Sequence, residues 1–267
     1  MNDSVSKLEG EGLANLAIDP EVLANELAAE LVGDPLDEIK NLDDDSKTAA
    51  QECEKGLIWL SQGHQERLQG LRVFCEYRDP RALPLLIPLL QEPCPVERMS
   101  AVYALGRNPC PRAIEILLQL LQRDSNAYVR KATAWSLGNY ADSRVLEPLL
   151  NSLQNDVAAV RLWAASSLAE VGSSSEKNAE LATSKLITSV LIDAEPVVRS
   201  NCIWSLGRLY EKLNNILQKE IDDVFSTILL EDQEPSVRYE ARVALEQLDT
   251  PQIKEKLKNL SEQGLLA

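Results

Sequence analysis

Residues 129–138 read VRKATAWSLG and residues 198–207 read VRSNCIWSLG. Three further segments follow the same pattern: VERMSAVYALG from Val96, VRLWAASSLAEVG from Val160 and VRYEARVALE from Val237. When the arginine is numbered 0, leucine stands at +7 in all five segments and glycine at +8 in three. These arginines are 32, 31, 38 and 39 residues apart: Arg98, Arg130, Arg161, Arg199 and Arg238. Because another apolar helical pattern precedes each one, the chain repeats a unit of two short helices.

Helices of about 10 to 13 residues are too short to be stable alone in water, so each unit must bury its apolar face against its neighbours. The repeat therefore predicts an all-α fold, an α-solenoid of helical hairpins. We expect about five full repeats, a leading half-repeat containing Arg67 and a C-terminal capping helix near residues 251–263. Prolines fall where helices should start, and the glycines at +8 suit helix ends.

An acidic residue lies five or six positions before each repeated arginine: Glu92, Asp124, Asp156, Asp193 and Asp232. An acid in the turn between two helices can accept hydrogen bonds from the free N–H groups at the next helix start. The arginine in that first helical turn can reach the acid of an adjacent repeat. Because the pattern recurs five times, we predict a structural ladder of ion pairs and no catalytic site.

Composition excludes several classes of function. The 267 residues carry 27 Lys and Arg against 42 Asp and Glu, a net charge of −15 that repels phosphates, so we expect no nucleic-acid binding. With no apolar run of 18 residues and no basic-then-apolar leader, we expect no membrane span and a cytoplasmic location. The only histidine is His64, which we expect in a surface loop, and nucleotide-binding and nucleophile motifs are absent. We predict that the chain is not an enzyme.

The first 50 residues form a separate acidic leader, with 13 acidic residues against 3 lysines. We divide the chain into this leader, residues 1–50, and a HEAT-like repeat domain, residues 51–267. Within the leader, the sequence from Pro20 puts four apolar residues on one helical face, with Asp19 as N-cap: Val22, Leu23, Leu27 and Leu31. This segment is either part of a solvated, partly disordered leader or a docking helix that folds onto a partner or onto the repeat domain.

Helical geometry separates the face that the stack buries from the opposite face. Positions −1, +3, +6 and +7 form one stripe, which we expect to be buried. Positions +1, +5 and +9 lie on the other side of the second helix, and second helices line the concave side of stacked hairpins. We predict that a partner binds there, through Met99, Tyr103, Arg107, Lys131, Trp135, Leu162, Trp204, Arg208 and Tyr239. The alternative is that Trp135 and Trp204 fold back over adjacent helices as packing residues.

None of the five cysteines is paired in a C-x-x-C motif, which argues against a zinc or iron–sulfur site. We expect Cys75 and Cys202 to be small apolar core residues. Cys94 and Cys110 lie in the turns EPCPVE and NPCPRA, where we expect exposed thiols. They are weak candidates for a shared metal site, and no resident cofactor is predicted.

The core V-R-x-x-A-x-x-x-L-G with its acidic turn resembles the HEAT-like repeats of phycobilisome lyases, over about four fifths of the chain. That superfamily includes bilin lyase subunits, phycobilisome degradation factors and adaptor proteins. The stretches LRVFCEYRDPRALPLLIPLLQ, MSAVYALGRNPCPRA and DSNAYVRKATAWSLGNY are more narrowly similar to cyanobacterial HEAT-repeat proteins that interact with the A-type iron–sulfur carrier. The resemblance implies a non-catalytic protein of iron–sulfur or iron homeostasis.

Two hypotheses about function follow. In the first, the chain is a non-catalytic scaffold whose concave face binds a partner protein, such as an A-type iron–sulfur carrier. In the second, it is a bilin lyase subunit or chromophore chaperone that holds a linear tetrapyrrole for transfer to a phycobiliprotein, or a phycobilisome-degradation adaptor. A tetrapyrrole carries propionates, which Arg107 and Arg208 could bind.

Overall fold

The computed structural model describes residues 46–248 and 250–263, which form thirteen α-helices and no strand. Twelve of the helices pair into six hairpins. Their first helices are α2 (Ser46–Leu60), α4 (Leu83–Leu89), α6 (Ile114–Arg123), α8 (Leu146–Asn155), α10 (Glu176–Ile192) and α12 (Asn215–Glu231). Their second helices are α3 (His64–Glu76), α5 (Pro95–Arg107), α7 (Ala127–Leu137), α9 (Ala158–Gly172), α11 (Pro196–Leu209) and α13 (Pro235–Leu248). Helix α14 (Pro251–Glu262) packs on α13 and closes the stack.

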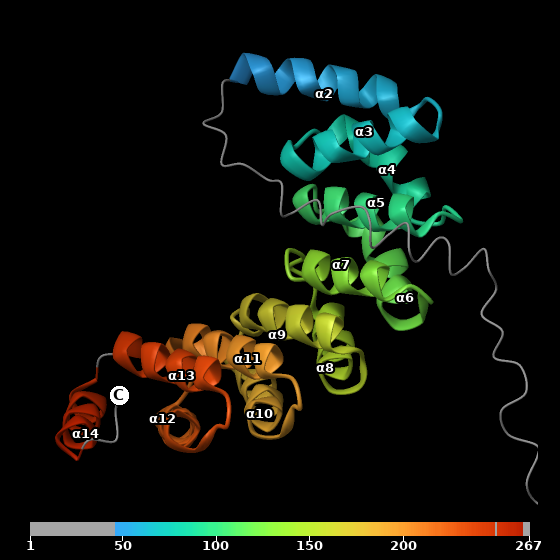
Figure 1. The fold of residues 1–267 in the computed structure, drawn as a ribbon. Helices are drawn as coiled ribbons and strands as arrows, with labels where there is room; N and C mark the ends of the chain where they lie inside the picture. The colour runs from blue at the N-terminus through green and yellow to red at the C-terminus, as the bar shows by residue number, and fades with distance from the viewer. Residues whose placement is uncertain (1–45, 249, 264–267) are drawn as a thin grey trace, which may run out of the picture.

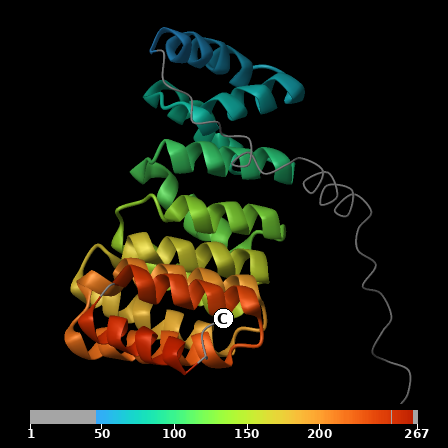
Figure 2. The same ribbon diagram turned by 60° about the vertical axis from the view of Figure 1, so that its left-hand side comes forward.

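The hairpins stack into a curved rod (Figure 1). Each second helix packs closely on the second helix of the next hairpin, whereas the first helices contact one another less. The second helices therefore line the inner side of the curve, and α6, α8, α10 and α12 lie on the outer side (Figure 1). Figure 2 shows the same layers following one another from the blue to the red end. The predicted all-α solenoid, with its second helices on the concave side, is confirmed.

The first hairpin is more complete than the sequence suggested. Helix α2 packs along α3, so it supplies the first helix of the leading half-repeat predicted around Arg67. The boundary that we drew at residue 50 falls within α2, and the predicted docking helix at residues 20–31 lies outside the described residues. His64 is not in a loop: it begins α3, and its Nδ1 lies 2.9 Å from Glu97 Oε1.

The predicted buried stripe is confirmed in the two repeats with the closest sequences. In α7 and α11 the residues at −1, +3, +6 and +7 are all fully buried: Val129, Thr133, Ser136, Leu137, Val198, Cys202, Ser205 and Leu206. Two of the three hydroxyl groups in this stripe bind the backbone: the Ser205 hydroxyl donates to Ala165 O at 2.9 Å and the Thr133 hydroxyl donates to Val129 O at 2.7 Å. The stripe thus forms one continuous core along the rod.

The repeated arginines form the predicted ladder. Arg130 illustrates the geometry: its Nη1 donates to Asp124 O in its own turn at 2.8 Å, while Nε and Nη2 bind the Asp156 carboxylate of the next turn at 2.9 and 2.7 Å. Arg98, Arg161 and Arg199 repeat this pattern with the next acidic turn. The rungs are Arg98–Asp124, Arg130–Asp156, Arg161–Asp193 and Arg199–Asp232. Each guanidinium therefore ties one turn to the following one.

Two carboxylates of the ladder, Asp193 and Asp232, are held in their charged form. Burial alone would raise the pKa of Asp193, but the hydrogen bonds from the Arg161 guanidinium and the Glu195 N–H, with the charges of Arg161 and Arg199, outweigh burial and hold this pKa below its usual value. The balance at Asp232 is the same, with Arg199 and the Glu234 N–H as donors. The ladder is therefore most stable where these carboxylates are ionised.

Of the three glycines at +8, Gly138 caps the end of α7 as predicted, but the other two do not end their helices. Gly106 and Gly207 lie within α5 and α11. A Cβ added to Gly106 would meet the Trp135 ring, and one added to Gly138 would meet Ser167 Oγ at 2.6 Å, so both glycines allow close packing of the next second helix. A Cβ added to Gly207 would meet no atom within 4 Å. The stack needs the first two glycines for packing, but it leaves the space beside Gly207 open.

Removing one carboxylate should weaken the ladder in a pH-dependent way. We expect Asp193→Asn to lower the free energy of unfolding at pH 7 by about 1–3 kcal/mol, because Arg161 loses its charged partner. A depressed folded-state pKa contributes stability above the unfolded value of about 4, and that stability is lost as the pH falls. In urea titrations, the difference from wild type should thus be full above about pH 5 and shrink below pH 4. Glu147→Gln, at an exposed position, should change stability by less than about 0.5 kcal/mol; a pH-independent deficit in Asp193→Asn would contradict this account.

The glycines allow a matched comparison. We expect Gly106→Ala to destabilise the protein, because the new methyl group overlaps the Trp135 ring. Gly207→Ala should stabilise it by about 0.5–1 kcal/mol, because alanine is the better helix former and its methyl group meets open space. Thermal melts of the two variants should move in opposite directions. A loss of stability in Gly207→Ala would show that the space beside it is filled.

Candidate functional site: the concave face

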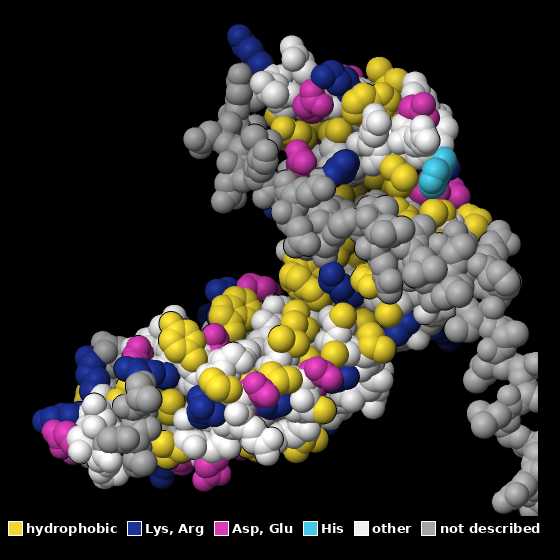
Figure 3. Space-filling model, viewed as in Figure 1, with side chains coloured by type: hydrophobic (Ala, Val, Ile, Leu, Met, Phe, Trp, Pro, Cys, Tyr) yellow, Lys and Arg dark blue, Asp and Glu magenta, His cyan; other side chains and the backbone are white. Residues whose placement is uncertain are grey.

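The concave face is built from positions +1, +5 and +9 of the second helices, which we call the inner wall. The buried stripe of each second helix packs into the core, so these three positions turn toward the hollow of the curve. Figure 3 shows hydrophobic side chains gathered on this side of the molecule, over α9, α11 and α13. The wall is not uniform along its length, because the residues predicted for it differ widely in exposure.

Two predicted wall residues belong to the core, and their assignment to a binding face is wrong. Met99 is 3% exposed and Tyr103 is 1% exposed. The reason is the close packing of α5 and α7: the rings of Tyr103 and Trp135 lie 5.4 Å apart at an interplanar angle of 57°. In this part of the stack, the aromatic residue of the next repeat covers the one before it.

Trp135 itself is half-buried, packed against the core between Tyr103 and Gly106. The alternative interpretation, in which this indole folds back over the adjacent helix, describes it better than a free binding residue. Arg107, Lys131 and Leu162 are also half-buried on the wall. Whether they contact a partner stays a prediction.

The other end of the wall is open. Trp204 on α11 is 41% exposed and Tyr239 on α13 is 67% exposed, and Arg208 follows Trp204 by one helical turn. We call these three residues, together with Gly207, the aromatic end of the inner wall. Tyr239 and Trp204 are on adjacent packed helices, so their exposed surfaces belong to one region of the concave face.

Arg208 holds the indole of Trp204 in place. Its guanidinium carbon lies 5.2 Å from the centroid of the Trp204 ring, a cation–π contact. Its Nη2 donates to Glu170 Oε1 on α9 at 2.7 Å. The indole is therefore supported from one side by a charge that is anchored to the neighbouring helix, and it presents apolar surface to the hollow. A rigid aromatic side chain of this kind is typical of binding hot spots.

The cysteines give no sign of a metal centre. Among the described residues, no group of three or more His, Cys, Asp and Glu side chains lies close enough to hold a metal ion. Cys94 is half-buried, but Cys110 is buried, so the prediction of two exposed thiols is wrong for Cys110. It precedes a 3₁₀ turn at Pro111–Ala113 that returns the chain onto the stack, close to the buried phenol of Tyr140. Cys75 and Cys202 are buried as predicted, and burial raises the pKa of the Cys202 thiol.

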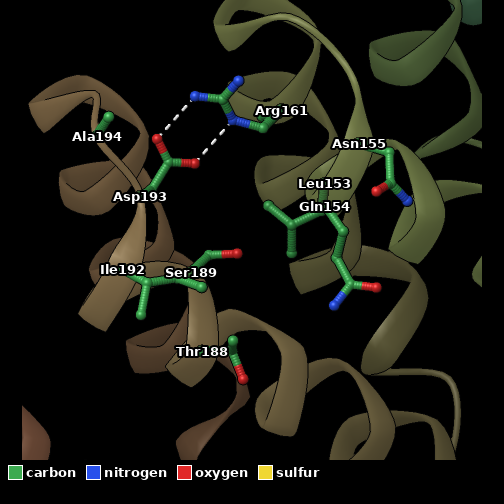
Figure 4. A pocket seen from close by; sticks show the side chains of 9 residues that line it. All are labelled: Leu153, Gln154, Asn155, Arg161, Thr188, Ser189, Ile192, Asp193 and Ala194. Carbon is green, nitrogen blue, oxygen red and sulfur yellow. Dashed lines mark hydrogen bonds and ion pairs between the residues drawn. The ribbon is translucent and has the colours of Figure 1, made fainter.

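The outer side carries two shallow grooves that the sequence did not indicate. The first lies between α8 and α10 and contains the Arg161–Asp193 rung (Figure 4). Because its charged groups already pair with each other, we read this groove as part of the ladder. The second lies between α10 and α12 beside Leu191 and Ile216, which are 51% and 80% exposed. Apolar residues of the first helices were expected to face the core, so the exposure of these two side chains was not predicted from the sequence.

Three solved structures with similar folds place the chain among helical repeat proteins. The complex of CpcE and CpcF of phycocyanin lyase from Nostoc sp. PCC7120 matches with a TM-score of 0.52 and 26% identity, covering 62% of this chain and 99% of the other. The karyopherin Kap121p matches with a TM-score of 0.60 and 14% identity, over 85% of this chain and 28% of the other. An engineered protein matches with a TM-score of 0.50 and 21% identity, over 84% and 98%. The similarities to Kap121p and to the engineered protein concern the fold alone.

No curated protein sequence matches the chain. Within the described residues, no helix is long and apolar enough to cross a membrane. Residues 64–137 and 114–207 match the HEAT repeats family, and together they run from the start of α3 to the last turn of α11 and include three of the four ladder pairs. The match spans more than half of the sequence and coincides with the stacked hairpins seen in the structure. The chain therefore belongs to the HEAT-repeat family, as a repeat scaffold of a kind suited to binding other proteins.

Proposed function

We propose that this protein is a non-catalytic scaffold that binds a partner protein on its inner wall, with the aromatic end as the anchor. The observation that carries the proposal is the exposure of Trp204 and Tyr239. At the equivalent positions of α5, Tyr103 and Met99 are buried, and the Tyr103 ring packs against Trp135 of the next repeat. The stack therefore has no need of exposed aromatic rings at α11 and α13, whereas a partner that covers them would gain apolar burial.

A partner in iron–sulfur or iron homeostasis is the more specific form of this proposal. It is supported by the sequence resemblance to HEAT-repeat proteins that interact with the A-type iron–sulfur carrier. In this form, the chain holds the carrier protein and contributes no metal ligand of its own. In this proposal the binding takes place in the cytoplasm, where a cysteine thiol such as that of Cys94 stays reduced.

A bilin lyase subunit or chromophore chaperone is the second candidate, and the similarity to the CpcE and CpcF complex of phycocyanin lyase favours it. In this form, Trp204 and Tyr239 would stack against a linear tetrapyrrole, and Arg208 would face its propionates. A phycobilisome-degradation adaptor would use the same wall to bind a phycobiliprotein, with no pigment transfer. The scaffold and the degradation adaptor would bind a protein on the inner wall, whereas the lyase subunit or chaperone would bind a pigment there.

Truncation of the exposed rings tests the scaffold. We expect the Trp204→Ala/Tyr239→Ala variant to bind a purified A-type iron–sulfur carrier about 10- to 100-fold more weakly than wild type in fluorescence anisotropy. Its free energy of unfolding should change by less than about 1 kcal/mol, because neither ring belongs to the hydrophobic core.

The matched control is Leu191→Ala/Ile216→Ala, which removes two exposed apolar side chains from the outer side. This control should bind the carrier like wild type. If the two double variants bind equally well, the inner wall is not the site. If neither wild type nor the variants bind the carrier, the three proteins are compared by capture of partners from a lysate. The proposal then requires partners that wild type and the outer-side control capture and that Trp204→Ala/Tyr239→Ala does not.

Absorbance titration with a linear tetrapyrrole tests the second candidate. A bound tetrapyrrole should show a red-shifted absorption band with wild type, and this band should be lost in Trp204→Ala and weakened in Arg208→Gln. The Leu191→Ala/Ile216→Ala variant should retain it. An unshifted spectrum with wild type at micromolar protein would exclude the pigment-binding candidate and leave the protein scaffold in place.

A further inference from the structure

The inner wall carries charge of the opposite sign to the chain as a whole. Across the six second helices, positions +1, +5 and +9 hold four basic residues, Arg72, Arg107, Lys131 and Arg208, against two acidic ones, Glu76 and Glu170. The chain has a net charge of −15. Helices α6, α8, α10 and α12, on the outer side, hold 8 acidic against 4 basic residues. A basic wall on an acidic protein favours an acidic ligand.

The aromatic end adds a requirement for apolar contacts. Trp204 and Tyr239 offer two exposed rings on adjacent helices, and Gly207 leaves open space beside them. A ligand segment can approach the α11 backbone at Gly207, where any side chain would stand in the way. The wall as a whole thus fits an acidic segment that carries several apolar side chains on one face.

The chain contains such a segment in its own leader. Residues 19–31 read DPEVLANELAAEL, with four acidic residues and the four apolar residues Val22, Leu23, Leu27 and Leu31 at helical spacing. The segment lies outside the described residues. Helix α2, to which the leader connects, starts on the open side of the curve (Figure 1). The described part of the chain therefore begins beside the hollow that the inner wall lines.

From this juxtaposition we infer that residues 19–31 bind the inner wall of the same molecule and must leave it before a partner binds. The inference rests on the proposed function, since both use the same wall. Acidic side chains of the segment pair with the basic side of the wall, chiefly at Arg107, and its leucines cover the rings of Trp204 and Tyr239. A tethered segment experiences an effective concentration of about 1 mM. An intrinsic Kd of about 100 µM would thus leave it bound in about nine of ten molecules.

Competition by the tethered segment provides the first test. A fluorescein-labelled peptide of residues 15–34 is titrated against the full-length wild-type chain and the full-length Leu23→Ser/Leu27→Ser/Leu31→Ser variant. The peptide should bind the leader variant about tenfold more tightly, because the tethered competitor is disabled, and binding should weaken as salt is raised. Adding Trp204→Ala/Tyr239→Ala to the leader variant should abolish peptide binding, while adding Leu191→Ala/Ile216→Ala should not.

Oxidative footprinting of the intact chain provides the second test. The oxidation rates of Trp204 and Tyr239 should rise several-fold in the leader variant, while the rate of Ile216 on the outer side stays constant. Equal peptide affinity for wild type and the leader variant, or unchanged footprints, would overturn the inference. A concentration-dependent dimer that the leader variant loses would also overturn it, because the segment would then bind a second copy.

The scaffold function and the binding of residues 19–31 to the inner wall can be contradicted independently of each other. If the peptide does not bind but Trp204→Ala/Tyr239→Ala still loses the partner protein, the scaffold function stands and the intramolecular ligand falls. If the peptide binds the wall and no partner protein does, the wall is a site for the leader alone. When both hold, the leader variant should bind the partner up to about tenfold more tightly than wild type.

Discussion

The fold depends on one repeated interaction, the guanidinium that joins two successive turns. Each ladder arginine donates to a carbonyl of its own turn and to the carboxylate of the next, as Arg130 does with Asp124 and Asp156. A hairpin of two short helices has no stable position by itself. The bidentate pair fixes both the distance and the rotation between neighbouring hairpins. The core stripe supplies most of the folding free energy, and the ladder determines the register in which that stripe is buried.

A fixed register also decides what the inner wall can expose. Position +5 of α5 packs against position +5 of α7, where the rings of Tyr103 and Trp135 lie 5.4 Å apart. Tyr103 is followed by Trp135 and is buried, whereas Trp204 is followed by the smaller Val243 and stays exposed. Gly106 leaves room for the Trp135 ring, whereas no neighbouring atom fills the space beside Gly207. One repeated geometry thus produces a closed wall at α5 and α7 and an open one at α11 and α13.

The sequence could predict everything that is common to the repeats. Periodicity was sufficient for the solenoid, the buried stripe at Val129 and Leu137, and the ladder, because each of these follows from positions counted within one repeat. Exposure on the wall was not predictable in this way. Tyr103 and Tyr239 lie on the same face of their helices, yet 1% of one and 67% of the other is exposed, because exposure depends on the neighbouring repeat. Cys110 was misjudged for the same reason, since its turn packs against Tyr140.

Departures from the repeat are consequently the best guide to function in a protein of this type. A feature that all repeats share is explained by stacking, and neither the arginines nor the aspartates point to a ligand. Exposed rings at Trp204 and Tyr239 contribute little to the core, and an open space at Gly207 costs helix stability with no packing in return. Covering apolar surface releases about 25 cal/mol for each Å² removed from water. The free energy that these residues do not contribute to folding is therefore available for binding, whether the occupant is a partner or the acidic leader.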